Sequence, residues 1–304
     1  IDLISHQLYI AQEVGNRIAP RVLLSDEVGL GKTIEAGLIL HRQLITGCAS
    51  RALILVPESL VHQWFVEMLR KFNVWVNIFD EERCTAIEKV HPDTNPFLDD
   101  QVILTSINFL ASHAKRAEQA KEAGWDLLVV DEAHHLEWST SEPSEEYQLV
   151  DSLSRETQGL LLLTATPEQL GQESHFARLR LLDPDRYSDL DQYKEETEQF
   201  ADIAPIATAL HEGMTLTAEQ RKALDAMPGL NTRMDSEILL AGLLDRHGPG
   251  RVIFRNTRAA MHDFPGRIAH LESLAPDRDT KEWLAHATAE FAADSGTGES
   301  IEKF

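Results

Sequence analysis

Cysteine, basic residues and long apolar runs are all scarce in this 304-residue sequence, and each scarcity excludes a class of protein. The only two cysteines, Cys48 and Cys84, form no C-x-x-C pair, which favours reduced thiols in the cytosol over a disulfide framework. No apolar run approaches the roughly 20 residues of a membrane-spanning helix, so we expect no membrane contact. The sequence starts without a basic-then-apolar leader or an initiator methionine, so we expect an excised or processed piece of a cytosolic protein.

Positive charge is also scarce, with 28 Lys and Arg residues against 50 Asp and Glu residues and a formal net charge of -22. A broad basic face that grips a phosphate backbone is therefore excluded, and any nucleic-acid contact must be local or completed by other parts of the protein. The chain has no H-E-x-x-H pattern or Cys/His spacing beside His134 and His135, and no G-x-S-x-G nucleophile motif. These absences argue against a zinc hydrolase and against a serine hydrolase.

Short apolar runs alternate with helical patterns through the first half of the chain. Most of the runs are continuous, as in strands covered on both faces, so we predict an α/β fold with a mostly parallel sheet and helices on both sides. The predicted strands are Arg21–Ser25, Ala52–Val56, Val76–Phe79, Val102–Thr105, Asp126–Val130, Leu160–Thr164 and Arg251–Arg255. The predicted helices between them include Thr33–Thr46, Glu58–Phe72 and Ile107–Glu122.

The pattern changes after Pro167, and this change suggests the domain boundaries. We expect a sheet lobe over residues 1–170 and a helical subdomain over 171–250. A return strand should then end the lobe over 251–267, and residues 268–304 should form an acidic tail or linker. The length agrees with one or two domains.

The strongest local motif lies between the first predicted strand and the helix that follows it. Its residues are Ser25, Asp26, Glu27, Val28, Gly29, Leu30, Gly31, Lys32 and Thr33. Glycines allow several backbone N–H groups to face one phosphate chain at a helix N-terminus. In such a loop Lys32 reaches the β- and γ-phosphates and the Thr33 hydroxyl binds Mg²⁺. The alternative is a glycine-rich turn with a lone surface lysine.

Asp26 stands where the general pattern G-x-x-x-x-G-K-[ST] has its first glycine. Aspartate tolerates left-handed backbone better than most residues, so the turn is expected to persist.

A pair of carboxylates, Asp131 and Glu132, follows the predicted strand Asp126–Val130. Carboxyl ends of parallel strands are where open α/β sheets bind ligands. Asp131 is placed to hold Mg²⁺ largely through water, and Glu132 to orient and deprotonate an attacking water. Taken alone, the pair also fits a solvated loop.

A third motif, Thr164-Ala165-Thr166-Pro167, again follows a buried strand. By itself it is a strand-to-turn transition that Pro167 ends. Beside the other motifs, its two hydroxyls form a pair able to hydrogen-bond His134. We therefore assign Ala133, His134, Thr164 and Thr166 a role in coupling the nucleotide site to neighbouring structure.

Together these motifs resemble the first RecA-like lobe of Swi/Snf-type helicase-like ATPases, and within them the bacterial members that associate with RNA polymerase. The segments that carry the resemblance are 20–41, 53–64, 125–136, 160–184 and 251–258. The resemblance implies a P-loop NTPase that uses ATP and Mg²⁺, acts on DNA or RNA and binds the RNA polymerase core. It further implies recycling of polymerase for transcription in the bacterial cytoplasm, near the nucleoid. An aspartate at position 26 is what this family shows.

The resemblance also gives roles to residues outside these motifs. Gln7 matches the position where such ATPases bind adenine through an amide, which is able to pair with the amino group and a ring nitrogen. Pro57, Ser59, Thr105 and Ser106 match segments that touch the nucleic-acid backbone. Hydroxyls hold phosphates without a large positive field, although Ser and Thr at strand ends also serve as helix caps.

Nothing after Pro167 resembles the second lobe of these motors, including the element with the catalytic arginine. Arg251, Arg255 and Arg258 lie in a segment that matches the first lobe, so we expect this chain alone to bind ATP weakly and not to turn it over. Two alternatives are a DEAH-type RNA helicase lobe and a polymerase-binding scaffold with a regulatory nucleotide site. The sequence does not indicate an oligomeric state.

Overall fold

The structure is a computed structural model that describes residues 4–27, 29–165, 171–211, 213–225, 239 and 252–256. The chain divides into two compact units, Ile1–Met261 and His262–Phe304, and every described residue belongs to the first. The predicted acidic tail over 268–304 therefore lies outside the described residues.

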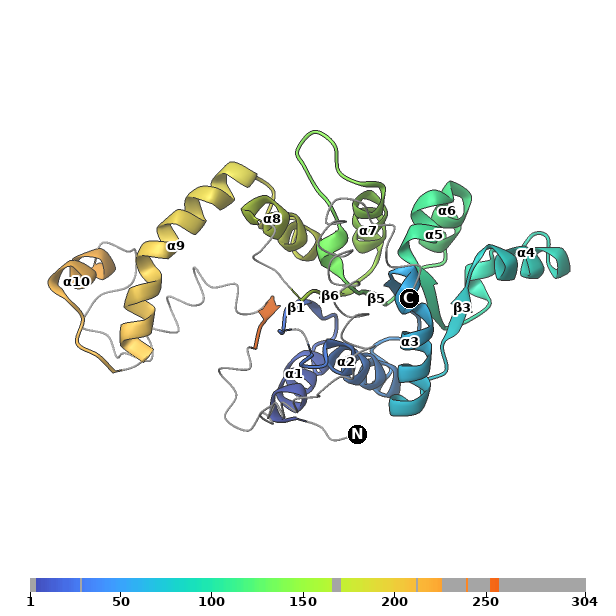
Figure 1. The fold of residues 1–304 in the computed structure, drawn as a ribbon, viewed down its shortest axis with the longest axis horizontal. Coiled ribbons are helices and arrows are strands. Elements are labelled where there is room, and N and C mark those ends of the chain that lie inside the picture. Colours follow the sequence, from blue (N-terminus) through green and yellow to red (C-terminus); the bar gives the residue numbers. More distant parts are fainter. Residues whose placement is uncertain are drawn as a thin grey trace, which may run out of the picture. The chain divides into compact units, whose positions relative to one another are not determined.

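Seven parallel strands form one sheet in the order β3-β4-β2-β5-β6-β1-β7 (Figure 1). Their bounds are β1 Arg21–Leu24, β2 Ala52–Val56, β3 Asn77–Phe79, β4 Val102–Ser106, β5 Leu127–Val130, β6 Gly159–Leu163 and β7 Ile253–Phe254. The predicted α/β fold with a parallel sheet is confirmed, and each predicted strand is present to within two residues at its ends. Continuous apolar runs identified these strands in the sequence because both faces of the sheet are covered.

Ten α-helices are described: α1 Ser5–Gly15, α2 Lys32–Thr46, α3 Val61–Glu67, α4 Glu81–Val90, α5 Ile107–Ser112, α6 Ala114–Glu122, α7 Glu145–Glu156, α8 Gly171–Leu182, α9 Leu190–His211 and α10 Ala218–Asp225. Short helical turns are η1 Glu58–Leu60, η2 Met68–Phe72, η3 Pro96–Leu98 and η4 Ala133–His135. None of the described helices is long and apolar enough to cross a membrane.

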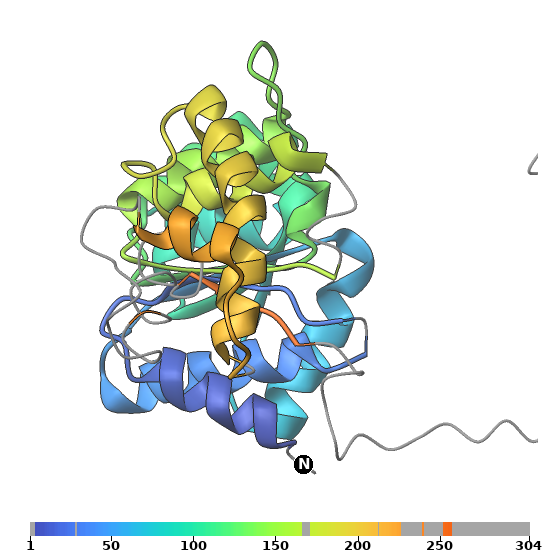
Figure 2. The same ribbon diagram turned by 90° about the vertical axis from the view of Figure 1, so that its left-hand side faces the viewer.

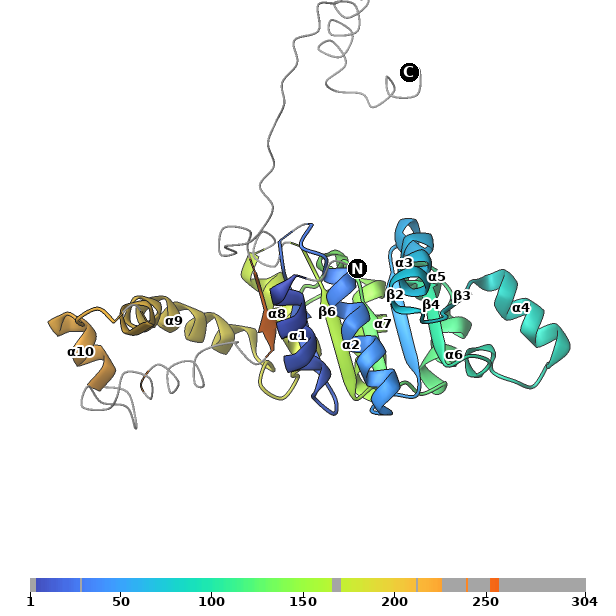
Figure 3. The same ribbon diagram turned by 90° about the horizontal axis from the view of Figure 1, so that it is seen from below.

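The sheet lies between two layers of helices, and each layer has its own apolar core (Figures 2 and 3). Side chains of α1, α2 and α3 pack on one face, while α5, α6, α7 and α8 pack on the other. Successive strand residues alternate between the cores, so Val22 and Leu24 join the first and Leu23 the second. Because helices cover both faces of the sheet, the carboxyl ends of the strands are held in position.

Two predicted helices are interrupted. The Glu58–Phe72 segment is a 3₁₀ turn, then α3, then a π-helical turn. The Ile107–Glu122 segment breaks at His113, whose backbone is not helical. There, Ser112 Oγ donates to the carbonyls of Asn108 and Phe109, so side-chain bonds compete with the helix ladder.

Between the third motif and β7, the described residues form helices α8, α9 and α10 and the turns that join them. Helix α8 packs on the sheet itself, because Ala177, Leu181 and Leu182 belong to the second apolar core. The domain boundaries at 170, 250 and 267 stay a prediction.

Candidate nucleotide-binding site

The three sequence motifs lie at one edge of the sheet because all their strands run in the same direction. Strand β6 pairs with β5 on one side and with β1 on the other, in register. Thr164 N, just after β6, donates to the Leu24 carbonyl at 3.0 Å, and Asp131 N, just after β5, donates to the Leu55 carbonyl at 2.9 Å. The threonine motif therefore separates the phosphate loop from the carboxylate pair.

The phosphate loop takes its shape from two glycines with left-handed backbone, Gly29 at φ 85° and Gly31 at φ 90°. Gly31 is the N-cap of α2 and has no side chain to cover the free N–H groups of the first turn. Lys32 Nζ donates to the Asp26 carbonyl at 2.9 Å, which folds the lysine back over the loop. Val28 lies outside the described residues. The loop presents a helix N-terminus and an ammonium group, a combination that suits a phosphate chain.

Gln7 lies on α1 and is buried against this loop. Its Nε2 donates to the Leu30 carbonyl at 2.9 Å, and its Oε1 accepts from Ile4 N at 3.3 Å. A Cβ atom on Gly31 would lie 2.6 Å from Gln7 Nε2, so the two residues are in close contact. The residue predicted to bind adenine is therefore held by the phosphate loop itself.

Asp26 acts differently from the sequence expectation. The positive-φ residues other than glycine are Asn73 and Glu132 within the described segments, so Asp26 does not use left-handed backbone. Its side chain is fully buried, and Oδ1 accepts from Asn256 N at 2.7 Å and from Asn256 Nδ2 at 3.1 Å. Aspartate is needed here because it joins the phosphate loop to the segment after β7.

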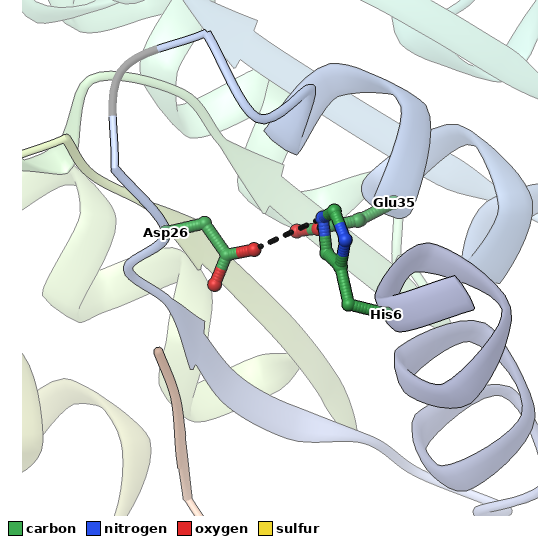
Figure 4. A group of neighbouring side chains, drawn as sticks. All are labelled: His6, Asp26 and Glu35. Atoms are coloured by element: carbon green, nitrogen blue, oxygen red, sulfur yellow. Dashed lines mark ion pairs between the residues drawn. The ribbon is translucent and has the colours of Figure 1, made fainter. Parts of the chain in front are cut away.

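Asp26 also belongs to a buried cluster with His6 of α1 and Glu35 of α2 (Figure 4). His6 Nε2 lies 3.5 Å from Asp26 Oδ2 and 3.3 Å from Glu35 Oε1. Burial, and then the negative charge of Asp26, raise the pKa of Glu35 to about 9, while Lys32 opposes the shift. The cluster brings α1, the phosphate loop and α2 together at one point.

Asp131 is buried at the end of β5 and is held by two hydrogen bonds. Trp64 Nε1 donates to its Oδ2 at 2.7 Å, and Glu132 N donates to its Oδ1 at 2.8 Å. Burial raises the pKa of Asp131, whereas these two bonds and the charge of Lys32 act in the opposite direction. The strand order β5-β6-β1 places the phosphate loop and the carboxylate pair at the same end of the sheet, so they are candidates for one site.

Glu132 has left-handed backbone at φ 48°, which is uncommon for a residue other than glycine and typical of functional sites. Its Oε2 lies 3.0 Å from His134 Nδ1, without the alignment of a hydrogen bond. Burial, followed by the neighbouring His135 and Arg178, lowers the pKa of His134. A lowered pKa favours the neutral imidazole, which weakens the ion pair between His134 and Glu132.

The coupling residues are partly located. Ala133 and Thr164 are fully buried, and Thr166 lies outside the described residues. The hydrogen bond between His134 and the threonine hydroxyls stays a prediction.

The residues predicted to touch nucleic acid differ in exposure. Ser59 is exposed and Pro57 half-buried. Thr105 Oγ1 is buried and donates to the Phe79 carbonyl at 2.6 Å, while the Ser106 hydroxyl caps α5. These last two hydroxyls serve the lobe, and nucleic-acid contact at all four positions stays a prediction.

The arginine triplet is only partly described. Arg255 is exposed, whereas Arg251 and Arg258 lie outside the described residues.

Sequence reasoning missed three participants: Trp64, Glu35 and Asn256. The indole N–H of Trp64 holds Asp131, although Trp64 belongs to none of the three sequence motifs. The sequence offered a signal for Glu35, because a charged residue interrupts the apolar run of α2. It also offered one for Asn256, because this residue follows β7 and ligands bind at the carboxyl ends of parallel strands.

The donor set at this edge suits Mg²⁺ and a triphosphate. Mg²⁺ prefers oxygen ligands and keeps several waters, and the Thr33 hydroxyl and the Asp131 carboxylate are of that type. Thr33 is half-exposed on the first turn of α2, next to Lys32. Two protein oxygens leave most of the ligands of such an ion to be supplied by water or by a bound phosphate chain.

Comparison with known proteins agrees with this geometry. The model of the SNF2-related domain matches residues 15–286. This chain belongs to the SNF2-related domain family. The RNA polymerase-associated protein RapA of Vibrio campbellii is 56% identical over 286 residues, covering 88% of this chain and 29% of that protein. The protein of the same name from Photobacterium profundum is 55% identical over 290 residues, covering 90% and 30%. The SNF2-related chain thus spans less than a third of the length of these relatives.

Two solved structures share the fold of this SNF2-related chain. The SWI2/SNF2 ATPase core of Sulfolobus solfataricus in complex with dsDNA has a TM-score of 0.56 at 20% identity, covering 87% of this chain and 47% of that one. The same core domain alone has a TM-score of 0.56, covering 98% and 53%. The parallel sheet therefore has the RecA-like fold of these two structures.

Proposed function

We propose that this chain is the ATP- and Mg²⁺-binding lobe of a nucleic-acid-dependent motor ATPase that acts with RNA polymerase. One observation carries the proposal: the phosphate loop after β1 and the carboxylate pair after β5 follow the carboxyl ends of parallel strands that flank β6 in one sheet. A lysine and a paired carboxylate set at the same edge are the parts that phosphoryl transfer needs. The names of the relatives support polymerase as a partner, and the dsDNA complex of the structural neighbour supports nucleic acid.

Each residue has a chemical task in this proposal. Lys32 and the N–H groups of α2 would bind the β- and γ-phosphates, and Gln7 would bind the adenine. Thr33 and Asp131 would hold Mg²⁺, which supplies charge neutralisation when it is bound. Glu132 would orient a water molecule and accept its proton, a task for which its position beside a neutral His134 leaves the carboxylate available.

Binding is tested by calorimetry with Mg-ATP. The chain should bind weakly, and Lys32→Ala should abolish binding because the ammonium folded over the loop is removed. Lys71→Ala is the matched control, since Lys71 pairs with Glu67 on the surface of the same lobe. Equal affinity of the parent chain and Lys32→Ala would remove Lys32 from the site.

Turnover is tested by comparing this chain with the longer protein that contains it. Arginine contacts to the transferring phosphoryl group contribute about 10³–10⁵ in rate, and we propose that the longer protein supplies them. This chain should therefore hydrolyse ATP at background rate with or without DNA. In the longer protein, Glu132→Gln should abolish hydrolysis and keep affinity, while Glu137→Gln, at an exposed position, should change neither.

Robust hydrolysis by the 304-residue chain would contradict the proposal that the longer protein supplies the arginine contacts. Loss of that activity on mutating Arg251, Arg255 or Arg258 would place the arginine in this lobe. A longer protein that binds polymerase but never hydrolyses ATP would favour a regulated scaffold instead.

With its net charge of -22, the chain alone should bind duplex DNA poorly at physiological salt, and nanomolar affinity in a gel shift would reveal an unseen phosphate-binding face. We further propose that the ATPase recycles polymerase during transcription.

A further inference from the structure

The cluster of His6, Asp26 and Glu35 has no task in the chemistry of the nucleotide (Figure 4). Its three donor atoms come from α1, the phosphate loop and α2, and they lie within 4.8 Å of one another. The side chains of Asp26 and Glu35 are 0% exposed and that of His6 is 9% exposed. Water therefore does not solvate these charges.

The cluster lacks the hydrogen bonds that its burial requires. Neither carboxylate oxygen of Glu35, and neither ring nitrogen of His6, has a hydrogen-bond partner among the described residues. A buried carboxylate without a donor is costly, and a second carboxylate beside it adds repulsion. Two carboxylates thus meet one imidazole in a buried site, and a cation bound among them would displace the proton that the raised pKa of Glu35 retains there.

The distances between the atoms of this cluster distinguish metal coordination from a simple hydrogen bond. A charged N–H donor and a carboxylate usually approach to about 2.7–2.9 Å. His6 Nε2 instead lies 3.5 Å from Asp26 Oδ2 and 3.3 Å from Glu35 Oε1, so one nitrogen is about equally far from both carboxylates. Ligands at roughly 2.0–2.1 Å from a tetrahedral zinc ion are separated by about 3.3–3.4 Å. Both distances from the imidazole nitrogen therefore match those between neighbouring ligands on one ion.

We propose that His6 Nε2, Asp26 Oδ2 and Glu35 Oε1 bind a zinc ion that fastens α1 to the phosphate loop and α2. An imidazole with two carboxylates suits Zn²⁺, whereas Mg²⁺ keeps its waters and prefers oxygen alone. The divalent ion balances the two carboxylates. Asn256 Nδ2 lies 3.2 Å from Asp26 Oδ2 and orients this ligand from outside, as residues around metal ligands commonly do. The proposal does not depend on ATP hydrolysis.

The test measures zinc bound to the untagged chain by calorimetry and by elemental analysis after dialysis. All samples carry Cys48→Ser, because Cys48 is an exposed thiol that would bind zinc elsewhere. One zinc ion per chain is expected. Glu35→Gln and His6→Asn should each weaken this binding at least tenfold, and zinc should raise the Tm of the parent but not of these variants.

Glu13→Gln and His113→Asn are the matched controls, since both residues are exposed and lie outside the cluster. Zinc binding that is absent from the parent, or that all four variants leave unchanged, would overturn the proposal. An infrared band of a protonated carboxyl that disappears in Glu35→Gln would also overturn it, because a proton would then replace the metal.

Cobalt substitution tests the site in the parent chain if the variants fail to fold. Tetrahedral Co²⁺ gives strong visible absorption, which zinc should displace with the same one-to-one stoichiometry. A weak spectrum typical of octahedral Co²⁺, or no spectrum, would overturn the proposal. ATP is absent from these experiments, so their outcome is separate from that of Lys32→Ala.

Discussion

Gly31 offers a sharp perturbation, because alanine at this position has two distinct costs. The left-handed backbone at φ 90° costs an alanine about 1–2 kcal/mol. In addition, the new Cβ atom would lie 2.6 Å from Gln7 Nε2, so the amide must move and lose its bond to the Leu30 carbonyl. A lost buried hydrogen bond adds about 0.5–1.5 kcal/mol. We expect Gly31→Ala to lower the free energy of unfolding by about 1.5–3.5 kcal/mol.

Gly47 provides the control for the backbone cost alone. It ends α2 with φ 72°, and a Cβ atom there would meet nothing within 4 Å. Gly47→Ala should therefore lower the free energy of unfolding by about 1–2 kcal/mol in urea titrations and leave Mg-ATP affinity unchanged. Gly31→Ala should weaken Mg-ATP binding at least tenfold in calorimetry, because it displaces the amide predicted to bind adenine.

A double-mutant cycle with Gln7→Ala isolates the contact between the two residues. Removing the amide relieves the clash, so positions 7 and 31 should show a coupling energy of about 1 kcal/mol, and positions 7 and 47 none. The reasoning is refuted if Gly31→Ala and Gly47→Ala have equal effects on stability while both bind Mg-ATP like the parent.

Two further substitutions test contacts that support the site. Trp64→Phe removes the donor to the buried Asp131 and should lower the free energy of unfolding by about 1–3 kcal/mol in urea titrations. Trp75→Phe, at an exposed position, should change it by less than about 0.5 kcal/mol. Equal effects of the two substitutions would show that the indole N–H of Trp64 contributes nothing to stability. Arg21→Met removes donors to five backbone carbonyls near the ends of α7 and α8 and should lower the free energy of unfolding by roughly 2–4 kcal/mol. The control Arg155→Met, at an exposed position, should lower it by about 0.5 kcal/mol or less. An equal Tm for the two variants would contradict this prediction.

The strands and the motifs at their ends were predictable because each depends on neighbouring residues. A continuous apolar run such as Ala52–Val56 identifies a strand buried on both faces, and the carboxyl-end rule then places Asp131. The break at His113 was not predictable, because side-chain bonds to the helix carbonyls decide it rather than hydrophobic periodicity. Helix propensity alone would continue through that residue.

Contacts between distant segments account for what the sequence did not reveal at the site. The indole of Trp64 reaches Asp131 only because α3 packs on the sheet face that carries the first apolar core. The sequence pattern of α3 shows an apolar face and gives no sign of this polar contact. The link between Asp26 and Asn256 spans 230 residues, so no local pattern announces it. Pairing of this kind follows from the order of strands, which propensities do not determine.

The late position of β7 has a consequence for the newly synthesised chain. Strand β1 is followed directly by the phosphate loop, but its partner β7 and Asn256 leave the ribosome more than 200 residues later. At about 5–20 residues per second, β1 has an unpaired edge for roughly 10–50 seconds of translation. During that interval the Asp26 carboxylate lacks its two donors, so the nucleotide loop is completed among the last parts of the sheet. Chains that stall before Ile253 would present an open strand edge next to an unfinished loop, which makes them targets for chaperones or for aggregation.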